Sequence, residues 1–458
     1  MDTVFNLLRI IAIAFLAFVG GAFVVLTKTF PYDYFNDAYQ AIIAVHDQKT
    51  RYKSPLQTDL WRAARTAKRG VTLYDKAKAF IGFTLYSSSQ AQKAFLIDMN
   101  GNAVQEWSLP IARIWEDPKR RPRPAGYVTW DFVYMYPNGD LLAMYAGMGE
   151  TPWGYGLVKM DKNSKVVWKY FDYVHHQLDV ADDGKIYTLT NAIRTNHIEG
   201  YENLTPPRID DYVVVLSPDG KPLKRVSILD ALLRSRYGRM MHATAWDIRS
   251  DFLHTNAIKI IDRATAAKLP FAKEGQVLLS LREIDTIAVL DLNKQEVVWA
   301  IRGPWHRQHD ADLLSNGDIM LFDNYGHYGP GGLSRVVEFK PTPLDIDWIY
   351  AGNEKHPLES GIRSGQQRLP NGNTLITESD GGRLFEVTRN GQIVWEYIDP
   401  VRAGANNELI PVISQGTQRF DAASLDPKFL ASLRQSKLHA RTNTDRAGSA
   451  GTAIRTSK

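Results

Sequence analysis

The heptapeptide Leu314–Met320 reads LSNGDIM in one-letter code, a polar Asn-Gly-Asp turn between two apolar runs. An Asn-Gly pair flanked by apolar residues is the strongest short-range signal of a β-hairpin. The same kind of turn recurs at residues 136–142, 181–187 and 369–375. This repetition indicates a chain built from many short antiparallel strands.

A second turn alternates with the first and leads into a strand that carries a tryptophan. These tryptophans are Trp107, Trp168, Trp299, Trp348 and Trp395. A sixth turn of this kind, at residues 218–220, has no tryptophan after it. One turn of each kind fills roughly 50 residues, as in the four-stranded blades of a β-propeller. We therefore predict an all-β, six-bladed β-propeller whose tryptophans pack between blades. One blade should have an irregular inner turn, stretched by residues 263–274.

The N-terminus carries an apolar stretch long enough to anchor the chain. Residues 10–26 contain no charge, and apolar residues continue past Arg9 towards the start. About twenty such residues in a helix cross a bilayer. A cleaved signal peptide is the competing interpretation, but no A-x-A site follows. The charges on either side of this stretch weakly favour an orientation in which the rest of the chain lies outside the cytoplasm.

These patterns predict four parts. Residues 1–30 form a transmembrane signal anchor, 31–75 a short helical linker, 76–435 the propeller with a C-terminal closing segment, and 436–458 a disordered basic tail. In the linker, apolar residues from Leu60 to Ala67 fit one face of a helix. The basic residues among them would be solvated: Arg62, Arg65, Lys68 and Arg69.

The amino-acid composition excludes several kinds of active site and of partner. The 458 residues include no cysteine, which excludes disulfides, thiol nucleophiles and cysteine-bound metals. The formal net charge is +5, but residues 436–458 hold five Lys and Arg against one Asp, so the body is almost neutral. We therefore expect no nucleic-acid partner.

Histidines recur where the first strand of successive blades begins. Three consecutive blades start with His175-His176, His254 and Gln308-His309. Polar residues at equivalent positions of neighbouring blades converge around the propeller axis, although they are far apart in sequence. Three histidines in register therefore indicate a site, although a single one would more often be structural.

Arg282 ends an apolar strand of the same blade as His254, so we expect it beside that histidine. With no carboxylate in the same inner ring, imidazoles and a guanidinium favour an anion, because Arg presents a planar fork of donors. Pairing of Arg282 with Glu283 or Asp285 is the structural alternative. Three histidines could also bind zinc or copper, which keeps a metal site open.

The sequence resembles the bacterial arylsulfotransferases, six-bladed periplasmic propellers. The resemblance covers the blades up to Pro400. It rests on segments that keep their order and blade spacing: His175-His176, His254-Thr255-Asn256, Leu279-Ser280-Leu281-Arg282, Gln308-His309-Asp310-Ala311, Leu321-Phe322-Asp323-Asn324 and Ser334-Arg335. The chain departs from the family in its short linker and membrane anchor, which replace an N-terminal β domain.

The resemblance implies that His309 is the nucleophile that becomes transiently sulfated. His254 and Arg282 would hold the sulfate oxygens, and His175 or His176, preferably His176, would assist. Asn256, Asn324 and Tyr325 are expected to bind substrate. Exposed aromatic residues, namely Trp130, Tyr325 or Tyr328, could form walls for a phenol. A neutral imidazole is a competent nucleophile near pH 7.

The implied reaction moves a sulfuryl group from an aryl sulfate donor to a phenolic acceptor. It uses neither the sulfate-carrying nucleotide PAPS nor any other cofactor, and no metal. We expect a single-pass protein of the bacterial inner membrane with a periplasmic propeller, with a homodimer or a membrane-complex partner left open. The alternatives are a non-catalytic membrane-tethered propeller scaffold and a metal-dependent propeller lyase or hydrolase.

Overall fold

A computed structural model describes residues 2–27, 29–32, 54–117, 122–149, 153–244, 248 and 250–433. The tail predicted at 436–458 and residues 33–53 of the predicted linker lie outside these residues. The chain forms two compact units, residues 1–57 and 58–458, and each is described by itself.

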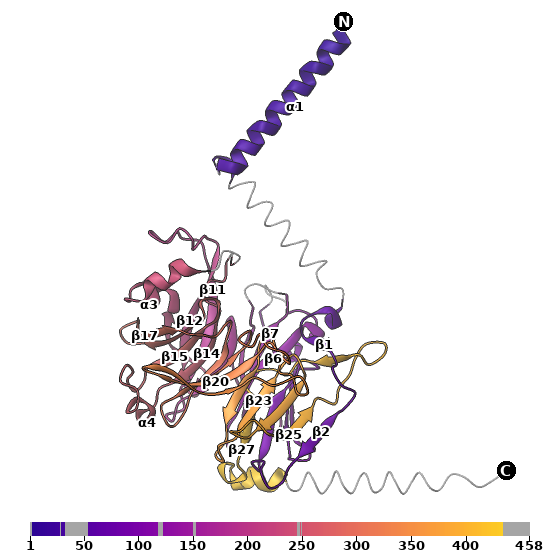
Figure 1. Cartoon of the computed structure of the whole chain (residues 1–458), viewed down its shortest axis with the longest axis vertical. Coiled ribbons are helices and arrows are strands. Elements are labelled where there is room, and N and C mark those ends of the chain that lie inside the picture. Colours follow the sequence, from indigo (N-terminus) through magenta and orange to yellow (C-terminus); the bar gives the residue numbers. More distant parts are fainter. Residues whose placement is uncertain are drawn as a thin grey trace, which may run out of the picture. The chain divides into compact units, whose positions relative to one another are not determined.

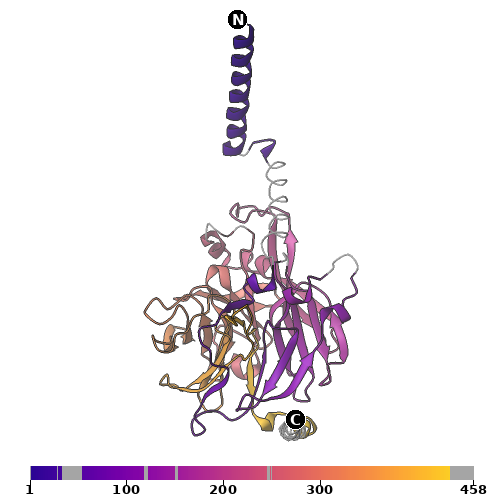
Figure 2. The ribbon, with the colours of Figure 1, turned by 90° about the vertical axis from the view of Figure 1, so that its right-hand side faces the viewer.

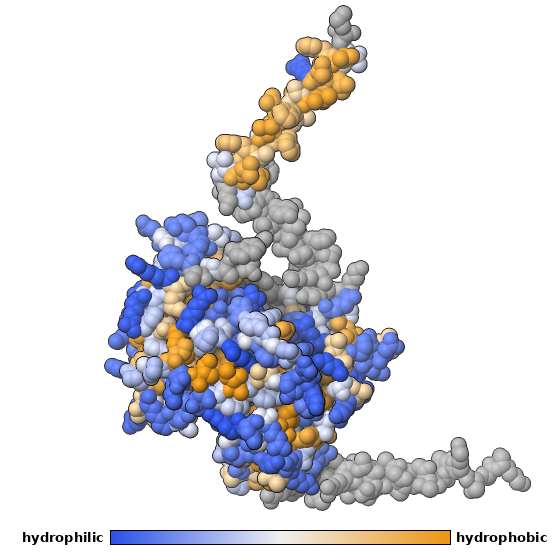
Figure 3. Space-filling view, in the orientation of Figure 1, coloured by the Kyte–Doolittle hydropathy of each residue, from blue (hydrophilic) through white to orange (hydrophobic). Residues whose placement is uncertain are grey.

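In the first unit, helix α1 (Asp2–Thr27) carries almost only apolar side chains (Figure 3). Its 26 residues extend for roughly 39 Å at 1.5 Å per residue. Residues Thr3–Thr27 contain a window of mean hydropathy 2.7, none of it buried. By length and composition α1 is thus a candidate membrane span, and a signal sequence would meet the same criteria. A 3-10 turn at Pro55–Gln57 ends the described part of this unit.

In the second unit, the described strands form six antiparallel sheets of four or five strands, the blades, and a separate two-stranded sheet (Figure 1; Figure 2). The first blade consists of β27 (Gln418–Phe420), β3 (Phe83–Ser87), β4 (Lys93–Ile97) and β5 (Ala103–Ser108). The second is β6 (Val128–Met135), β7 (Leu141–Gly147), β8 (Gly156–Met160) and β9 (Val166–Tyr170). The third is β10 (Val174–Val180), β11 (Ile186–Arg194), β12 (Arg208–Leu216) and β13 (Pro222–Ser227).

The remaining blades follow in chain order. The fourth is β14 (Thr255–Ile260), β15 (Val277–Leu281), β16 (Thr286–Asp291) and β17 (Glu296–Arg302). The fifth is β18 (His309–Leu313), β19 (Ile319–Asp323), β20 (Arg335–Pro341) and β21 (Leu344–Tyr350). The sixth is β22 (Gly365–Arg368), β23 (Thr374–Glu378), β24 (Arg383–Val387) and β25 (Ile393–Ile398), with β2 (Gly70–Tyr74) added outside. The predicted six-bladed propeller is confirmed.

Short helices occupy connections between these strands. The stretched inner turn predicted at 263–274 is confirmed, because α4 (Arg263–Ala266) lies between β14 and β15. Helix α3 (Ile228–Leu233) follows β13. The 3-10 turns of this unit are Ile111–Arg113, Ala125–Tyr127, Gly238–Ala243, Arg282–Ile284 and Ala422–Ser424.

The outer-strand tryptophans pack between blades, as predicted. The indole N–H of Trp107 donates to Gly139 O of the second blade (3.1 Å), and that of Trp168 donates to Pro218 O of the third (3.1 Å). Gly220 shows why this turn needs glycine: its φ is +82°, and a Cβ there would lie 2.5 Å from the Trp168 ring.

The ring closes between the sixth and first blades. Strand β27, near the C-terminal end of the described chain, pairs with β3 as the innermost strand of the first blade. Trp395 of the sixth blade donates to Met99 O of the first (3.0 Å). Closure therefore joins distant parts of the sequence, and the inner strands surround one axis.

The predicted helical linker is wrong over its described C-terminal part. Strand β1 (Trp61–Ala63) pairs with β26 (Leu409–Pro411), and β2 pairs with β25. The basic residues there are not simply solvated, since Arg62 contacts Asp380 (3.0 Å) and Arg65 contacts Glu378 (2.6 Å). The apolar spacing of this segment fits a helix, but the segment pairs with other strands instead.

Candidate active site

A cavity of about 220 Å³ lies where the inner strands begin. All six blades contribute to its wall, so the cavity lies on the propeller axis. Its lining residues are Asp59, Thr129, Asp131, Ala146, Gly147, Met148, Gly149, Trp153, His176, His254, His309, Ile362, Arg363 and Gln415. A larger cleft of about 1020 Å³ lies along residues 74–83, but no predicted site residue lines it.

Backbone irregularities aim the histidines at this cavity. The pairing register shifts at the start of β6, β10, β14 and β18. His176 and His254 adopt left-handed backbone conformations, with φ of 60° and 47°. Bulges of this kind redirect a side chain away from the regular sheet face.

His309 is held from one side and open on the other. Its Nδ1 lies 2.7 Å from Asn324 Oδ1 and 3.2 Å from Arg307 O, two acceptors. The amide orientation of Asn324 is fixed, because its Nδ2 donates to Ser360 O (2.7 Å) and Arg363 O (3.0 Å). Nδ1 therefore carries the proton, and Nε2, buried without a partner among the described residues, keeps its lone pair.

Burial also keeps the His309 ring neutral. Desolvation, helped by the charge of Arg282, lowers the pKa of His309 well below its ordinary value. The ring is 1% exposed. A buried neutral imidazole with a free Nε2 lone pair is a potential nucleophile.

His254 is oriented by a carboxylate that sequence reasoning did not find. Its Nδ1 contacts Asp251 Oδ2, three residues upstream. Burial, and then the charges of Arg282 and Arg307, lower the pKa of His254 well below its ordinary value. Burial raises the pKa of Asp251 to about 7. Because Nδ1 of His254 contacts Asp251, its Nε2 atom remains available to a ligand in the cavity.

Of the histidine doublet, His176 lines the cavity and His175 lies behind it. The two Nδ1 atoms are 2.7 Å apart, and His175 Nε2 is 3.6 Å from Asp211 Oδ1. Burial lowers the pKa of His175 to about 3 and that of His176 well below its ordinary value. Burial, together with Asp251, raises the pKa of Asp211 well above its ordinary value.

Arg282 follows β15, and its backbone N–H donates to His254 O (3.3 Å). Its Nη1 pairs with Glu283, as the structural alternative foresaw, whereas its buried Nε has no partner among the described residues. Its charge lowers the pKa of His176, His254 and His309. Arg282 therefore places positive potential beside the histidine cluster without lining the cavity.

The residues expected to bind substrate lie outside the cavity wall. Asn324 is buried and engaged with His309, and the Asn256 amide donates to Gln308 O (2.8 Å). Tyr325 packs against His306, with 5.9 Å between ring centroids. The prediction that Trp130 forms an exposed wall is wrong, because Trp130 is fully buried between blades. Tyr328 is 84% exposed and does not line the cavity.

The aromatic wall is instead Trp153, whose ring centroid lies 5.3 Å from His254 and 6.1 Å from His176. It stands on the β7–β8 connection, where no repeat pattern singled it out. Arg363, two residues before β22, also lines the cavity. The expected absence of carboxylates from the ring was wrong, since Asp59 and Asp131 line the same cavity. Asp131 stands at the strand-start position that the repeat defines, so that signal was available.

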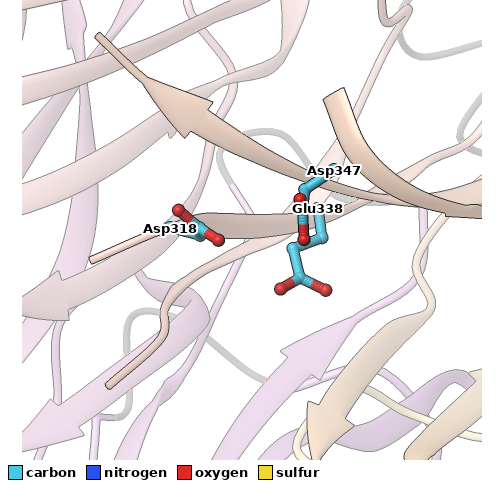
Figure 4. Close-up of side chains that lie close together, drawn as sticks. All are labelled: Asp318, Glu338 and Asp347. Atoms are coloured by element: carbon cyan, nitrogen blue, oxygen red, sulfur yellow. The ribbon is translucent and has the colours of Figure 1, made fainter. Parts of the chain in front are cut away.

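Metal binding has a candidate elsewhere among the described residues. Oxygens of Asp318, Glu338 and Asp347 lie within 4.8 Å of one another (Figure 4). Arg368 and Arg389 both contact Glu338, and Arg389 also lies 2.6 Å from Asp347. Arginines thus already pair with two of the three carboxylates, Glu338 and Asp347. The described His176, His254 and His309 do not bring one nitrogen each within that distance.

The fold and site define a class: a six-bladed propeller with buried, neutral histidines around an axial cavity. The family model of the arylsulfotransferases (ASST) matches residues 133–399, more than half of the chain. The protein therefore belongs to the arylsulfotransferase family, which confirms the resemblance seen in the sequence.

Other comparisons are distant. No curated protein matches the sequence. A protein of unknown function from Bacteroides caccae is 15% identical, with a TM-score of 0.44 over 73% of this chain and 99% of that one. Streptogramin B lyase is 11% identical, with a TM-score of 0.39 over 75% and 88%. Virginiamycin B lyase from Staphylococcus aureus is 10% identical, with a TM-score of 0.37 over 78% and 96%.

Proposed function

We propose that the protein is a PAPS-independent aryl sulfotransferase that works through a sulfohistidine at His309. The free His309 Nε2 in the axial cavity is the observation that carries this proposal. Its lone pair attacks the sulfur of an aryl sulfate, an N–S bond forms, and the S–O bond to the aryl group breaks. The electron pair leaves on the phenolate oxygen. In the second half, the oxygen of an acceptor phenol attacks sulfur and the N–S bond breaks.

His254 and Arg282 stabilise the charge on the sulfuryl oxygens. His254 lines the cavity and is oriented by Asp251, whereas Arg282 lies behind it and contributes positive potential without lining the cavity. Preorganised donors of this kind act most strongly in a site shielded from water. Loss of one donor typically lowers the rate by about 10²- to 10³-fold.

His176 protonates the departing phenolate and deprotonates the acceptor. The short Nδ1–Nδ1 contact with His175 supports this role. If His175 donates to His176 Nδ1, then His176 carries its proton on Nε2, towards the cavity. Asp211 behind His175, with its raised pKa, can replace the proton that is passed forward.

We place the propeller on the periplasmic side of a bacterial inner membrane, held there by α1 as an uncleaved single-pass anchor. The length and hydropathy of α1 support the anchor. The donor and acceptor are small aryl sulfates and phenols, as the family suggests. A homodimer and a membrane-complex partner both remain compatible with this placement.

The test is sulfuryl transfer from 4-nitrophenyl sulfate to phenol by the full chain in detergent. The His309→Ala variant should lose transfer entirely, while His356→Ala, a surface histidine outside the cavity, should keep it. Equal activity of the wild type and His309→Ala would overturn the assignment of the nucleophile.

A further inference from the structure

The cavity wall has two halves that come from different blades. The histidines belong to the third, fourth and fifth blades, in sequence and in space. The other polar lining residues belong to the sixth, first and second: Arg363, Gln415, Thr129 and Asp131. Since the six blades follow one another around the axis, these residues face the histidines across the cavity.

These four residues and Asp59 form the polar cluster of the cavity, and the charges of Arg363 and Asp59 both act on Asp131. Arg363 Nη2 lies 3.3 Å from Asp59 Oδ2. Asp131 accepts a hydrogen bond from the backbone N–H of His176 (3.3 Å). Gln415 pairs with Phe132, the residue after Asp131, through a parallel bridge. The charged and polar groups therefore share one side of the cavity.

Several polar atoms of this cluster have no partner among the described residues. They are Thr129 Oγ1, both side-chain polar atoms of Gln415, Arg363 Nη1 and Asp59 Oδ1. Thr129 is 6% exposed and Gln415 is 2% exposed. Buried polar groups cost free energy unless they are hydrogen-bonded, so unpartnered ones that line a cavity indicate a polar ligand group.

The chemistry of the cluster selects the ligand group. Arg363 and Gln415 Nε2 donate, Asp59 and Gln415 Oε1 accept, and Thr129 can do either. An anionic group would meet Asp59 and Asp131, and a cationic group would meet Arg363. A neutral hydroxyl, which donates and accepts at once, satisfies both kinds of atom.

The size of the cavity and its apolar lining limit what can bind beside the polar cluster. Trp153, Met148 and Ile362 supply apolar lining in the same cavity. A cavity of roughly 150 Å³ accommodates benzene, so about 220 Å³ accommodates one aromatic ring with small substituents. Drug-sized ligands occupy cavities of roughly 300 Å³ or more.

We infer that Thr129, Gln415 and Arg363 form a specificity subsite that selects monocyclic phenols carrying a second hydroxyl group away from the reacting one. This inference rests on the proposed sulfotransferase function. The second hydroxyl binds the cluster while the phenolic oxygen faces His309. The three residues bind substrate and take no part in the chemical step.

The test compares 4-(hydroxymethyl)phenol with 4-ethylphenol, which has a methyl group where the first has a hydroxyl. Dissociation constants of both are measured by calorimetry on the full chain in detergent, without a donor. The ratio of kcat/KM for the two acceptors is then measured with 4-nitrophenyl sulfate. The variants are Gln415→Leu and Thr129→Val. The control is Thr374→Val, which removes a buried, unpartnered hydroxyl outside the cavity.

The wild type should prefer 4-(hydroxymethyl)phenol by at least about tenfold, because a site built for a hydroxyl discriminates strongly against its absence. Gln415→Leu and Thr129→Val should each reduce this preference several-fold, and Thr374→Val should not. Equal binding of both phenols to the wild type, or an unchanged preference in a folded Gln415→Leu protein, would overturn the inference. Preferential binding without any sulfuryl transfer would instead refute the proposed function and leave the subsite standing.

Discussion

His309 depends on a neighbour whose own orientation is fixed by two backbone carbonyls. Asn324 gives its amide protons to Ser360 and Arg363, so only its oxygen can face the imidazole. The consequence is one tautomer, with the lone pair on the nitrogen that lines the cavity. Asn324 thus orients the His309 ring.

Replacement of Asn324 should therefore change the tautomer. We expect Asn324→Leu to raise the population of the Nε2–H form of His309, because only the more distant acceptor Arg307 O (3.2 Å) then remains for the Nδ1 proton. Sulfation of the enzyme should slow by about tenfold or more, since the wrong tautomer has no nucleophilic lone pair. Nitrogen-15 NMR shifts of the His309 ring report the tautomer, and single-turnover kinetics report the rate. A folded variant with the wild-type tautomer and rate would contradict this assignment.

The pH dependence follows from the buried ring. Protonation of Nε2 blocks attack, and desolvation with Arg282 lowers the pKa of His309 well below the ordinary 6.5. Protonation of the ring on acidification therefore begins below the usual histidine range. The nitrogen-15 shifts of the His309 ring should stay those of a neutral imidazole from about pH 8 to about pH 6, even where the sulfation rate changes with the carboxyl of Asp251, whose pKa burial raises to about 7. A shift change of the ring centred near pH 6.5 would show that burial does not hold it neutral.

The strand-start histidines could be predicted from sequence because the hairpin repeat fixes their register. Asp251, Trp153 and Arg363 could not, because each stands on a connection whose path no period determines. The contact of Asn324 with His309 could not be predicted either, since only the carbonyls of Ser360 and Arg363 reveal which way its amide points.

At the level of elements, repeated turns with inter-blade tryptophans identify the propeller, and these patterns were legible in the sequence. Strands β1 and β2 could not be predicted from such patterns, because the strands that they pair with, β26 and β25, lie more than 300 residues away in the sequence. Sheet edges at such sequence separation leave no local pattern. The closing strand β27 could not be predicted either, since a strand of three residues is too short to show a hydrophobic period.

Closure by β27 depends on a buried ion pair. Arg419 contacts Glu386 of β24, and both side chains are 0% exposed. Arg419→Met should reduce the free energy of unfolding by about 3 to 5 kcal/mol, because it leaves a buried carboxylate without its counter-charge. Urea denaturation measures the change.

The matched variant is Arg419→Met combined with Glu386→Gln. The amide keeps the oxygen that accepts from Phe80 N (2.8 Å) and Asn373 Nδ2 (2.6 Å), but removes the buried charge. It should recover a large part of the lost stability. If the double variant is no more stable than Arg419→Met, the loss does not come from an uncompensated charge.

At the scale of the whole molecule, an apolar helix is joined to an almost neutral propeller. If α1 is an anchor, the protein isolated from native membranes should require detergent and retain residues 2–27. The intact mass of the purified protein decides this. A mature chain that begins after α1 and stays in solution without detergent would show that the helix is a cleaved signal sequence.

In the proposed reaction, His309 carries the sulfuryl group between two substrates. The most direct test is incubation of the full chain with an aryl sulfate and no acceptor, quenching at alkaline pH, and mass analysis of the peptide that contains His309. We expect one added sulfuryl group on His309, and this group should disappear when phenol is added, as phenyl sulfate forms. An unmodified His309 peptide alongside continued transfer of sulfuryl groups to phenol would contradict this expectation.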